Sequence, residues 1–105
     1  MNNLIDGHYA LKDANGIPKF YRLTHGTNQW KNYIFIQYQA GDEYFDIKNP
    51  TIVKNLINIF KLNPLASMAL YGAEIGKCAI CSRTLTDDLS IKRGIGLICW
   101  NKLNK

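Results

Sequence analysis

The chain has 105 residues, of which 47% are hydrophobic and 20% charged; this composition excludes intrinsic disorder and fits one globular domain. No apolar run approaches the roughly 20 residues of a membrane-spanning helix, so we expect no membrane partner. The N-terminus lacks the basic start and apolar run of a signal peptide, which favours a cytoplasmic location. The net charge is +5, and most of the excess lies in residues 77–105, where Asp87 and Asp88 oppose the basic residues Lys77, Arg83, Lys92, Arg93, Lys102 and Lys105.

The first half of the chain shows the alternating apolar pattern of β-strands separated by short turns. Asn15-Gly16 favours a tight turn because both residues accept positive φ, and Gly41-Asp42 marks a second turn. Strands joined by such short turns pair in antiparallel order. We therefore expect a four-stranded antiparallel meander with strands over residues 7–12, 19–23, 30–39 and 44–47.

Aromatic residues make up 11% of the chain and are concentrated in this half. Aromatic side chains on a sheet most often pack in the core or across a hairpin, and stacking on nucleic-acid bases is the alternative. Both interpretations apply to Tyr9, Phe20, Tyr21, Tyr33 and Phe35.

Beyond the fourth strand the apolar spacing becomes helical. Asparagine precedes proline at residues 49–50 and 63–64, which is typical of a helix N-cap followed by proline in the first turn. The sequence predicts helices over 50–61 and 64–72, with Gly72 ending the second, and both helices on one face of the sheet. The apolar stripe of the first helix comprises Ile52, Leu56, Ile59 and Phe60.

Three cysteines, the only ones in the chain, point to a metal site in the C-terminal third. Cys78 and Cys81 form a Cys-x-x-Cys pair, and Cys99 follows at a predicted helix start. Two sulfurs from one tight turn and a third from a following helix can bind the same ion. We predict a zinc site (Zn²⁺) that folds this part of the chain; a redox Cys-x-x-Cys and unlinked buried thiols are the alternatives.

The predicted module follows the order of a treble clef: a Cys-x-x-Cys turn, a short hairpin, and then a helix over residues 97–104 with Cys99 in its first turn. The positive end of that helix favours a thiolate. Gly94 and Gly96 can supply the positive φ that the chain needs where it folds back toward the metal.

The fourth ligand is open at this point. Structural zinc usually has four protein ligands, and the cysteines supply three. A carboxylate of Asp87 or Asp88, a nitrogen of His8 or His25, a water or a group from a partner could complete the site. A bound water would also suit a hydrolytic site. Because those two aspartates are the only general-base candidates near the cysteines in sequence, we expect no catalysis.

The cysteines belong to a longer pattern, GKCAICSRTLTDDLSIKRGIGLIC, at positions 76–99. It resembles an uncharacterised domain family of phages and prophages whose members end in Cys-x-x-Cys-(Gly)-Arg-x-Leu-Thr-Asp-Pro-x-Ser-x-x-x-Gly-Ile-Gly-Pro-x-Cys. Asp88 and Leu97 replace prolines of that pattern, and neither change removes a cysteine. The residues that match are Cys78, Cys81, Arg83, Leu85, Thr86, Asp87, Ser90, Gly94, Ile95, Gly96 and Cys99.

The resemblance implies a phage origin and bound zinc, and the family has no agreed activity. Asp87 belongs to the family pattern and Asp88 does not. The resemblance therefore implies that Asp87 is the fourth metal ligand.

Together these observations predict an α+β fold: a sheet-plus-helices domain over residues 1–75 and a treble-clef-like zinc module over 76–105. We expect a non-enzymatic phage accessory protein that binds nucleic acid through this basic module. An alternative is a protein-interaction module that binds and inhibits a host protein through its aromatic sheet. A metal-dependent hydrolase is a third possibility. The expected phosphate contacts are Arg83, Lys92, Arg93 and Lys102.

Overall fold

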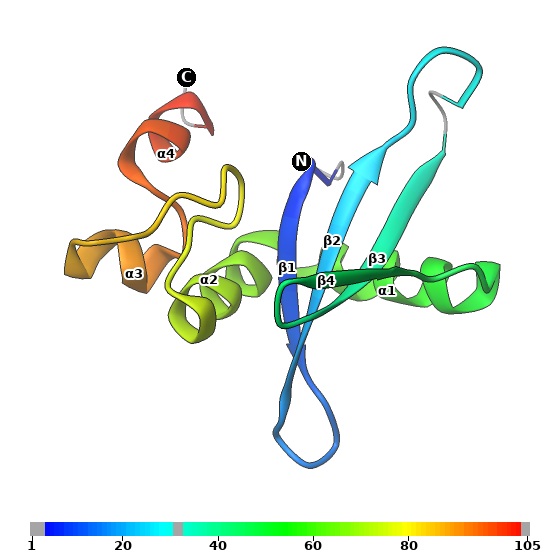
Figure 1. The fold of residues 1–105 in the computed structure, drawn as a ribbon, viewed down its shortest axis with the longest axis horizontal. Helices are drawn as coiled ribbons and strands as arrows, with labels where there is room; N and C mark the ends of the chain where they lie inside the picture. The colour runs from blue at the N-terminus through cyan, green and yellow to red at the C-terminus, as the bar shows by residue number, and fades with distance from the viewer. Residues whose placement is uncertain (1–3, 31–32, 104–105) are drawn as a thin grey trace.

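The computed structural model describes residues 4–30 and 33–103 and shows an α+β fold built on a four-stranded antiparallel sheet. The strands lie in the order β1-β2-β3-β4, which confirms the predicted meander. Figure 1 shows the sheet on one side of the molecule and the C-terminal helices on the other. The strands are β1 (Gly7–Lys12), β2 (Pro18–His25), β3 (Ile34–Ala40) and β4 (Glu43–Asp46).

The third strand begins later than its sequence predicts. Residues Asn28–Trp30 form a short 3-10 helix, η1, and positions 31–32 lie outside the described residues. The hairpin closes through a hydrogen bond of 2.9 Å from the Gly26 amide to the Tyr33 carbonyl. The polar loop that precedes β3 therefore extends further than the apolar pattern indicated.

Four α-helices follow the sheet, and asparagine caps begin the first two as predicted. The Asn49 side chain accepts a hydrogen bond of 2.9 Å from the Thr51 amide, and Asn63 accepts one of 3.2 Å from the Ala66 amide. None of the helices in the described residues is long and apolar enough to cross a membrane. The helices are α1 (Pro50–Leu62), α2 (Pro64–Ile75), α3 (Asp88–Arg93) and α4 (Leu97–Leu103).

The prediction that Gly72 ends the second helix is wrong. Helix α2 continues to Ile75, and Gly76 ends it in the left-handed conformation with φ of 78°. Gly72 is instead a packing position, because a Cβ atom there would lie 2.1 Å from the Cα atom of Gly94. A glycine in a helix can serve either purpose, and the local sequence does not distinguish them.

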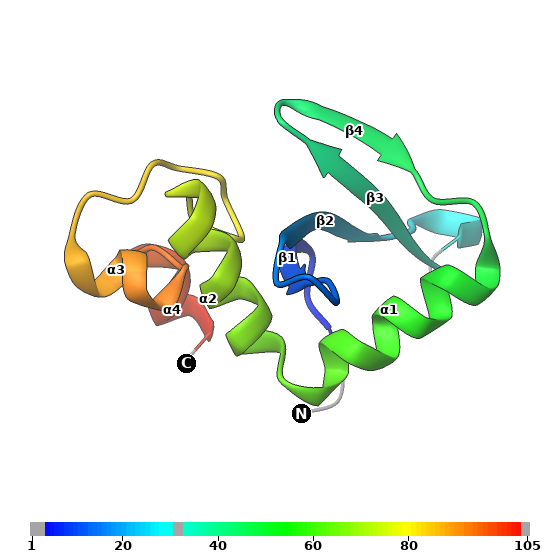
Figure 2. The same ribbon diagram turned by 90° about the horizontal axis from the view of Figure 1, so that it is seen from below.

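Helices α1 and α2 lie on opposite faces of the sheet, so the prediction that both share one face is also wrong. Phe60 of α1 stacks on Tyr9 at 4.9 Å between ring centroids. Tyr71 of α2 stacks on His8, the neighbouring residue of β1, at 4.8 Å. Because successive strand residues point to opposite faces, the two helices enclose β1 from both sides (Figure 2).

An aromatic row crosses the α1 face of the sheet. Tyr9, Tyr21, Tyr38 and Phe45 occupy paired positions on the four strands. Tyr9 is fully buried, whereas Phe45 on the outer strand is 50% exposed. Beneath the row, Leu56 and Phe60 of α1 are buried, and the other two residues of the predicted stripe, Ile52 and Ile59, are 47% and 44% exposed. The core therefore lies at the β1 side of the sheet and thins toward β4.

Candidate metal centre

The Cys-x-x-Cys pair occupies a tight turn that follows α2 directly. Lys77 and Thr84 form an antiparallel bridge at its base, and the Cys78 amide donates to the Arg83 carbonyl at 2.8 Å. Within the turn, the Ser82 amide donates to the Cys78 carbonyl at 2.9 Å, and Ser82 adopts a positive φ of 65°. The backbone bonds hold both cysteines on one short loop.

Between this turn and Cys99, the chain forms helix α3 instead of the predicted hairpin. Asp87 begins the helix and Gly94 ends it with φ of 72°, as expected for Gly94. Gly96 does not adopt positive φ; its amide donates to the Cys78 sulfur at 3.3 Å. Cys99 then lies in the first turn of α4, as predicted.

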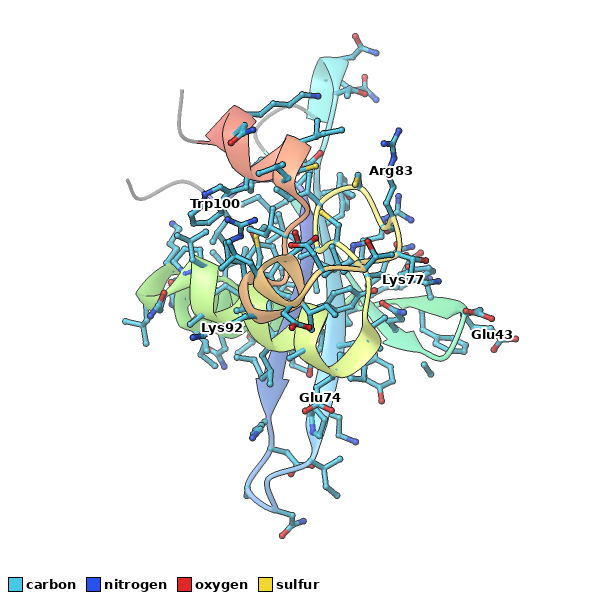
Figure 3. All side chains as sticks on the ribbon, turned by 90° about the vertical axis from the view of Figure 1, so that its left-hand side faces the viewer. Glu43, Glu74, Lys77, Arg83, Lys92 and Trp100 are labelled. Atoms are coloured by element: carbon cyan, nitrogen blue, oxygen red, sulfur yellow. The ribbon has the colours of Figure 1, made fainter. Side chains whose placement is uncertain are left out.

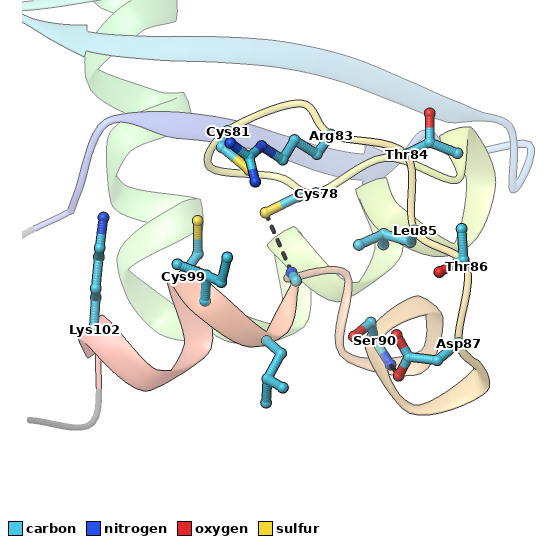
Figure 4. A pocket seen from close by; sticks show the side chains of 13 residues that line it. Cys78, Cys81, Arg83, Thr84, Leu85, Thr86, Asp87, Ser90, Cys99 and Lys102 are labelled. Carbon is cyan, nitrogen blue, oxygen red and sulfur yellow. Dashed lines mark hydrogen bonds between the residues drawn. The ribbon is translucent and has the colours of Figure 1, made fainter.

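The three cysteine sulfurs converge at one point, where all lie within 4.8 Å of one another (Figure 4). Cys78 is fully buried and Cys99 is 9% exposed, whereas Cys81 is exposed. Three sulfurs at this separation could hold a single metal ion, because a metal–sulfur bond is about 2.3 Å for zinc. The sequence prediction that these three residues share one site agrees with this geometry.

The electrostatics of the sulfurs favour a cation among them. Burial raises the pKa of the Cys78 thiol, but amides of Cys81, Gly96 and Ile80 donate to its sulfur and hold the pKa below its ordinary value. Burial and the other two sulfurs raise the pKa of Cys99 to about 12. Three thiolates at such short distances repel one another unless a positive charge lies between them.

The turn that carries Cys78 and Cys81 makes close backbone contacts with α3, and α3 makes them with α2. The Ala79 amide donates to the Gly94 carbonyl at 2.8 Å, joining the cysteine turn to the end of α3. A Cβ atom on Gly94 would lie 2.2 Å from the Met68 carbonyl oxygen of α2. The cysteine turn, the end of α3 and α2 therefore pack without intervening side chains at these points.

The sheet contacts the cysteine turn through His8 of β1. Both the His8 amide, at 2.6 Å, and its Nδ1, at 3.1 Å, bond to the Ala79 carbonyl. A carbonyl only accepts, so Nδ1 carries the proton, and Nε2 accepts from the Tyr44 hydroxyl at 3.0 Å. Burial lowers the pKa of His8; the hydrogen bond to the Ala79 carbonyl offsets part of this effect, and Arg22 lowers the pKa slightly further. His8 therefore links the sheet to the turn with both ring nitrogens in use.

The structure does not bring Asp87 to the sulfurs. Its Oδ2 accepts a hydrogen bond of 3.0 Å from the Ser90 amide, as the N-cap of α3. The hydrogen bonds from Ser90 hold the pKa of Asp87 below its ordinary value. Figure 4 shows Asp87 and Ser90 together, apart from the cysteines. The other histidine considered as a ligand, His25, contacts Asp6 instead.

The four predicted phosphate contacts form two groups. Arg83 and Lys102 are exposed and line a cavity of about 460 Å³ together with the three cysteines. Lys92 and Arg93 lie in the last turn of α3. The Arg93 guanidinium lies 4.9 Å from the ring centroid of Trp100, and its buried Nε has no hydrogen-bond partner in the described residues. Figure 3 shows Arg83 projecting away from the side where Lys92 and Trp100 lie.

Sequence reasoning missed the residues that support the site. The sequence indicates His8 only as one of several candidate ligands, whereas its bond to the Ala79 carbonyl joins residues 71 positions apart. Gly7 also approaches this carbonyl, since its Cβ would lie 2.9 Å from the oxygen. No spacing signal exists for contacts between such distant segments. The glycine before a strand histidine was the single local indication that backbone passes closely there.

Comparison with known proteins finds one family match. A model described as a family of unknown function (DUF6011) matches residues 68–104, which include most of α2 and all three cysteines. No curated protein and no solved structure matches the chain. The matched segment begins inside α2, the helix whose backbone contacts Gly94, while the domain boundary at residue 76 stays a prediction.

Proposed function

We propose that this protein is a non-enzymatic, phage-encoded accessory protein that is stabilised by bound zinc and binds nucleic acid in the host cytoplasm. Three elements make up the proposal: the metal at Cys78, Cys81 and Cys99, the positive charge beside it, and a polyanionic partner. The observation that carries the proposal is that Arg83 and Lys102, from segments distant in sequence, line one cavity with the cysteine sulfurs.

Zinc is the metal that best fits these donors. Thiolates are soft ligands, and intracellular sites built on cysteines from a turn and a helix start most often hold Zn²⁺. The cysteines would hold the ion between the turn after α2 and the first turn of α4. In this arrangement the ion contributes to folding, because an unliganded cluster would leave partly buried thiols without partners.

Arg83 and Lys102 are the preferred phosphate contacts. Both side chains are exposed and project from the part of the molecule that carries the positive excess. Lys92 and Arg93 have a second role that needs no partner, because cations in the last turn of a helix stabilise its dipole. Arg93 is further engaged with Trp100. We therefore assign the first pair to nucleic-acid binding and keep Lys92 as a secondary contact.

A salt titration tests this assignment. Fluorescence anisotropy measures binding of the zinc-loaded protein to mixed-sequence single- and double-stranded DNA and to RNA, each at several salt concentrations. The Arg83→Gln, Lys102→Gln double variant should flatten the slope of log K against log salt by about 1.4 to 1.8, because each lost phosphate contact removes about 0.7 to 0.9. Lys61→Gln, an exposed position at the end of α1, is the matched control. Absence of binding to all three probes at low salt would refute the proposal.

A second candidate function, capture of a host protein, rests on the groove between β3 and α1. Strand β4 pairs with β3 only from Gln37 to Ala40, so the preceding part of β3 pairs with β2 on one edge and has no strand partner on its other edge in the described residues. A groove of about 870 Å³ lies there, lined by apolar residues that include Phe35, Val53 and Ile57 and by charged residues at Arg22, Asp46, Lys48 and Lys54. Phe35 is 47% exposed and Tyr33, which also lines the groove, is 55% exposed, so aromatic surface is available there to a partner.

Affinity capture from host lysate separates the two candidates. Recovery of one stoichiometric protein that survives nuclease treatment and is lost in Phe35→Asp would favour host-protein binding. Recovery that disappears after nuclease treatment and in the Arg83→Gln, Lys102→Gln variant would favour nucleic acid.

A further inference from the structure

The chain does not complete the ligand set of its own cysteine cluster. Every His, Cys, Asp and Glu of the sequence lies in residues 4–30 and 33–103, and among these only Cys78, Cys81 and Cys99 come together as ligands. His8 uses both ring nitrogens in hydrogen bonds. Asp87 caps α3. A tetrahedral metal at the cluster therefore takes its fourth ligand from elsewhere.

The cluster is accessible from one side. Its sulfurs line a cavity of about 460 Å³ whose other lining residues include Thr84, Leu97 and Ile98, and Asp87, whose carboxylate is engaged as the cap of α3. Cys81 is exposed, and Leu97 and Ile98 are 58% and 61% exposed at the cavity rim. A small molecule or the tip of a side chain has room to approach the sulfurs from this side. The opposite side is closed by the turn backbone, where Cys78 and Ala79 are fully buried.

A cationic side chain, Lys102, lies about one helical turn after Cys99, where a fourth ligand from the same helix would be expected. Lys102 follows Cys99 by three residues on α4, so the two side chains share one face of the helix. Both line the cavity, and Arg83 lines it from the cysteine turn (Figure 4). A fourth cysteine placed at this position would complete the site from within the chain. Lysine there supplies positive charge instead.

We propose that the fourth ligand is an exogenous thiolate, drawn to the cluster by Lys102 and Arg83. Three thiolates and a divalent cation carry a net charge of about −1, so a further anion is repelled unless cations lie beside it. A neutral water ligand would need no such cations. Sulfur matches the softness of the other three donors. The thiol binds through sulfur after its proton passes to solvent, and no electron transfer is involved.

This inference rests on the metal part of the proposed function. It uses Arg83 and Lys102, which are also the proposed phosphate contacts, but its test contains no nucleic acid, so its outcome does not depend on nucleic-acid binding. The test uses the full chain loaded with Co²⁺ in place of zinc, because cobalt–thiolate absorption reports the number of sulfur ligands. Failure to bind cobalt at the three cysteines would refute the metal site itself. Cobalt binding without any response to thiol would refute the inference alone.

Glutathione and acetate are the first two probes. Glutathione should change the cobalt absorption saturably, with stronger sulfur-to-metal bands, and acetate should bind at least tenfold more weakly. Lys102→Gln should weaken glutathione binding about tenfold, equivalent to about 1.4 kcal/mol. Lys92→Gln, a lysine on the neighbouring helix that does not line the cavity, should leave it unchanged. An unaltered spectrum with glutathione, or equal affinities in both variants, would overturn the proposal.

Lys102→Cys provides an internal reference. This variant should give, without added thiol, the spectrum of the glutathione-saturated protein and should no longer respond to glutathione. A Lys102→Cys spectrum identical to that of the unmodified protein without thiol would show that this face does not reach the metal and would contradict the proposal.

The source of the thiolate is distinguished by a third probe, a peptide Gly-Cys-Gly with blocked ends. Glutathione carries extra negative charge that Arg83 and Lys102 can contact, whereas the blocked peptide resembles a cysteine of another protein. Tighter binding of glutathione supports a free anionic thiol as ligand, and tighter binding of the peptide supports a partner cysteine. Lack of response to both overturns the inference.

Discussion

Gly72 and Gly94 touch through their backbones: a Cβ atom on Gly72 would lie 2.1 Å from the Cα atom of Gly94. Gly72 belongs to α2, and Gly94 ends α3 just before the segment that carries Cys99. Tyr71, the residue before Gly72, stacks on His8 of the sheet. Helix α2 therefore connects the sheet to the cysteine cluster through two adjacent residues, Tyr71 and Gly72.

Gly72→Ala should destabilise the protein although alanine favours a helix. The exchange gains up to about 1 kcal/mol of helix propensity, but the clash with backbone has no flexible side chain to relieve it. We expect a net loss of about 2 kcal/mol or more in the free energy of unfolding, measured by urea denaturation of the zinc-loaded protein. Gly16→Ala is the control, because nothing lies within 4 Å of that position and only its positive φ is strained. A Gly72→Ala protein as stable as the parent would contradict this packing.

Asp87 should prove to be a helix cap and not a metal ligand. Asp87→Ala removes the acceptor for the Ser90 amide, and we expect a lower melting temperature with unchanged metal stoichiometry. Asp87→Asn should retain most of the stability, because an asparagine oxygen also accepts this bond. Loss of metal from either variant, measured by elemental analysis with all three cysteines intact, would restore the ligand role that the family resemblance implied.

His8 should make the stability depend on pH. Its pKa is lowered in the folded state, so the folded protein binds fewer protons than the unfolded chain. The contribution of His8 is therefore present above the ordinary histidine pKa of about 6.5 and is lost as the pH falls below it. We expect the melting temperature of the parent to fall more steeply over this range than that of His8→Gln.

The comparison between variants isolates the effect of His8, because proton competition for the cysteines is common to both proteins. His25→Gln serves as a second control, since His25 is solvent-exposed and contacts Asp6. Equal slopes for the parent and His8→Gln would show that the contact with the Ala79 carbonyl tolerates a charged imidazole.

Local signals in the sequence were sufficient for most of the elements. Asn49 and Asn63 before proline located both helix starts, and the tight turn at Gly16 and the turn at Gly41 both occur with positive φ. The three cysteines could be grouped because metal coordination imposes a short-range spacing on two of them. These features depend on a few neighbouring residues and are readable without tertiary structure.

Features that depend on tertiary packing could not be predicted in the same way. Helices α1 and α2 lie on opposite faces because Phe60 packs on Tyr9 and Tyr71 packs on the neighbouring residue of β1, His8. The helical periodicity of a sequence shows which side of a helix is buried, but it does not show which face of the sheet that helix covers. Helix α3 has six residues, too few for a periodic signal, and nothing in the local sequence distinguishes its capping residue Asp87 from a metal ligand. Tyr33 and Phe35 are 55% and 47% exposed, although aromatic residues on a strand are more often buried.

Zinc content, measured in the parent protein and in its cysteine variants, decides whether the three sulfurs hold a metal ion. The purified protein should contain one zinc per chain, and Cys78→Ser, Cys81→Ser and Cys99→Ser should each lose it. Removal of the metal by a chelator should expose the amides of residues 77–103 to hydrogen exchange while the β1–β2 hairpin stays protected. A metal-free protein in which residues 77–103 remain fully protected would contradict the account.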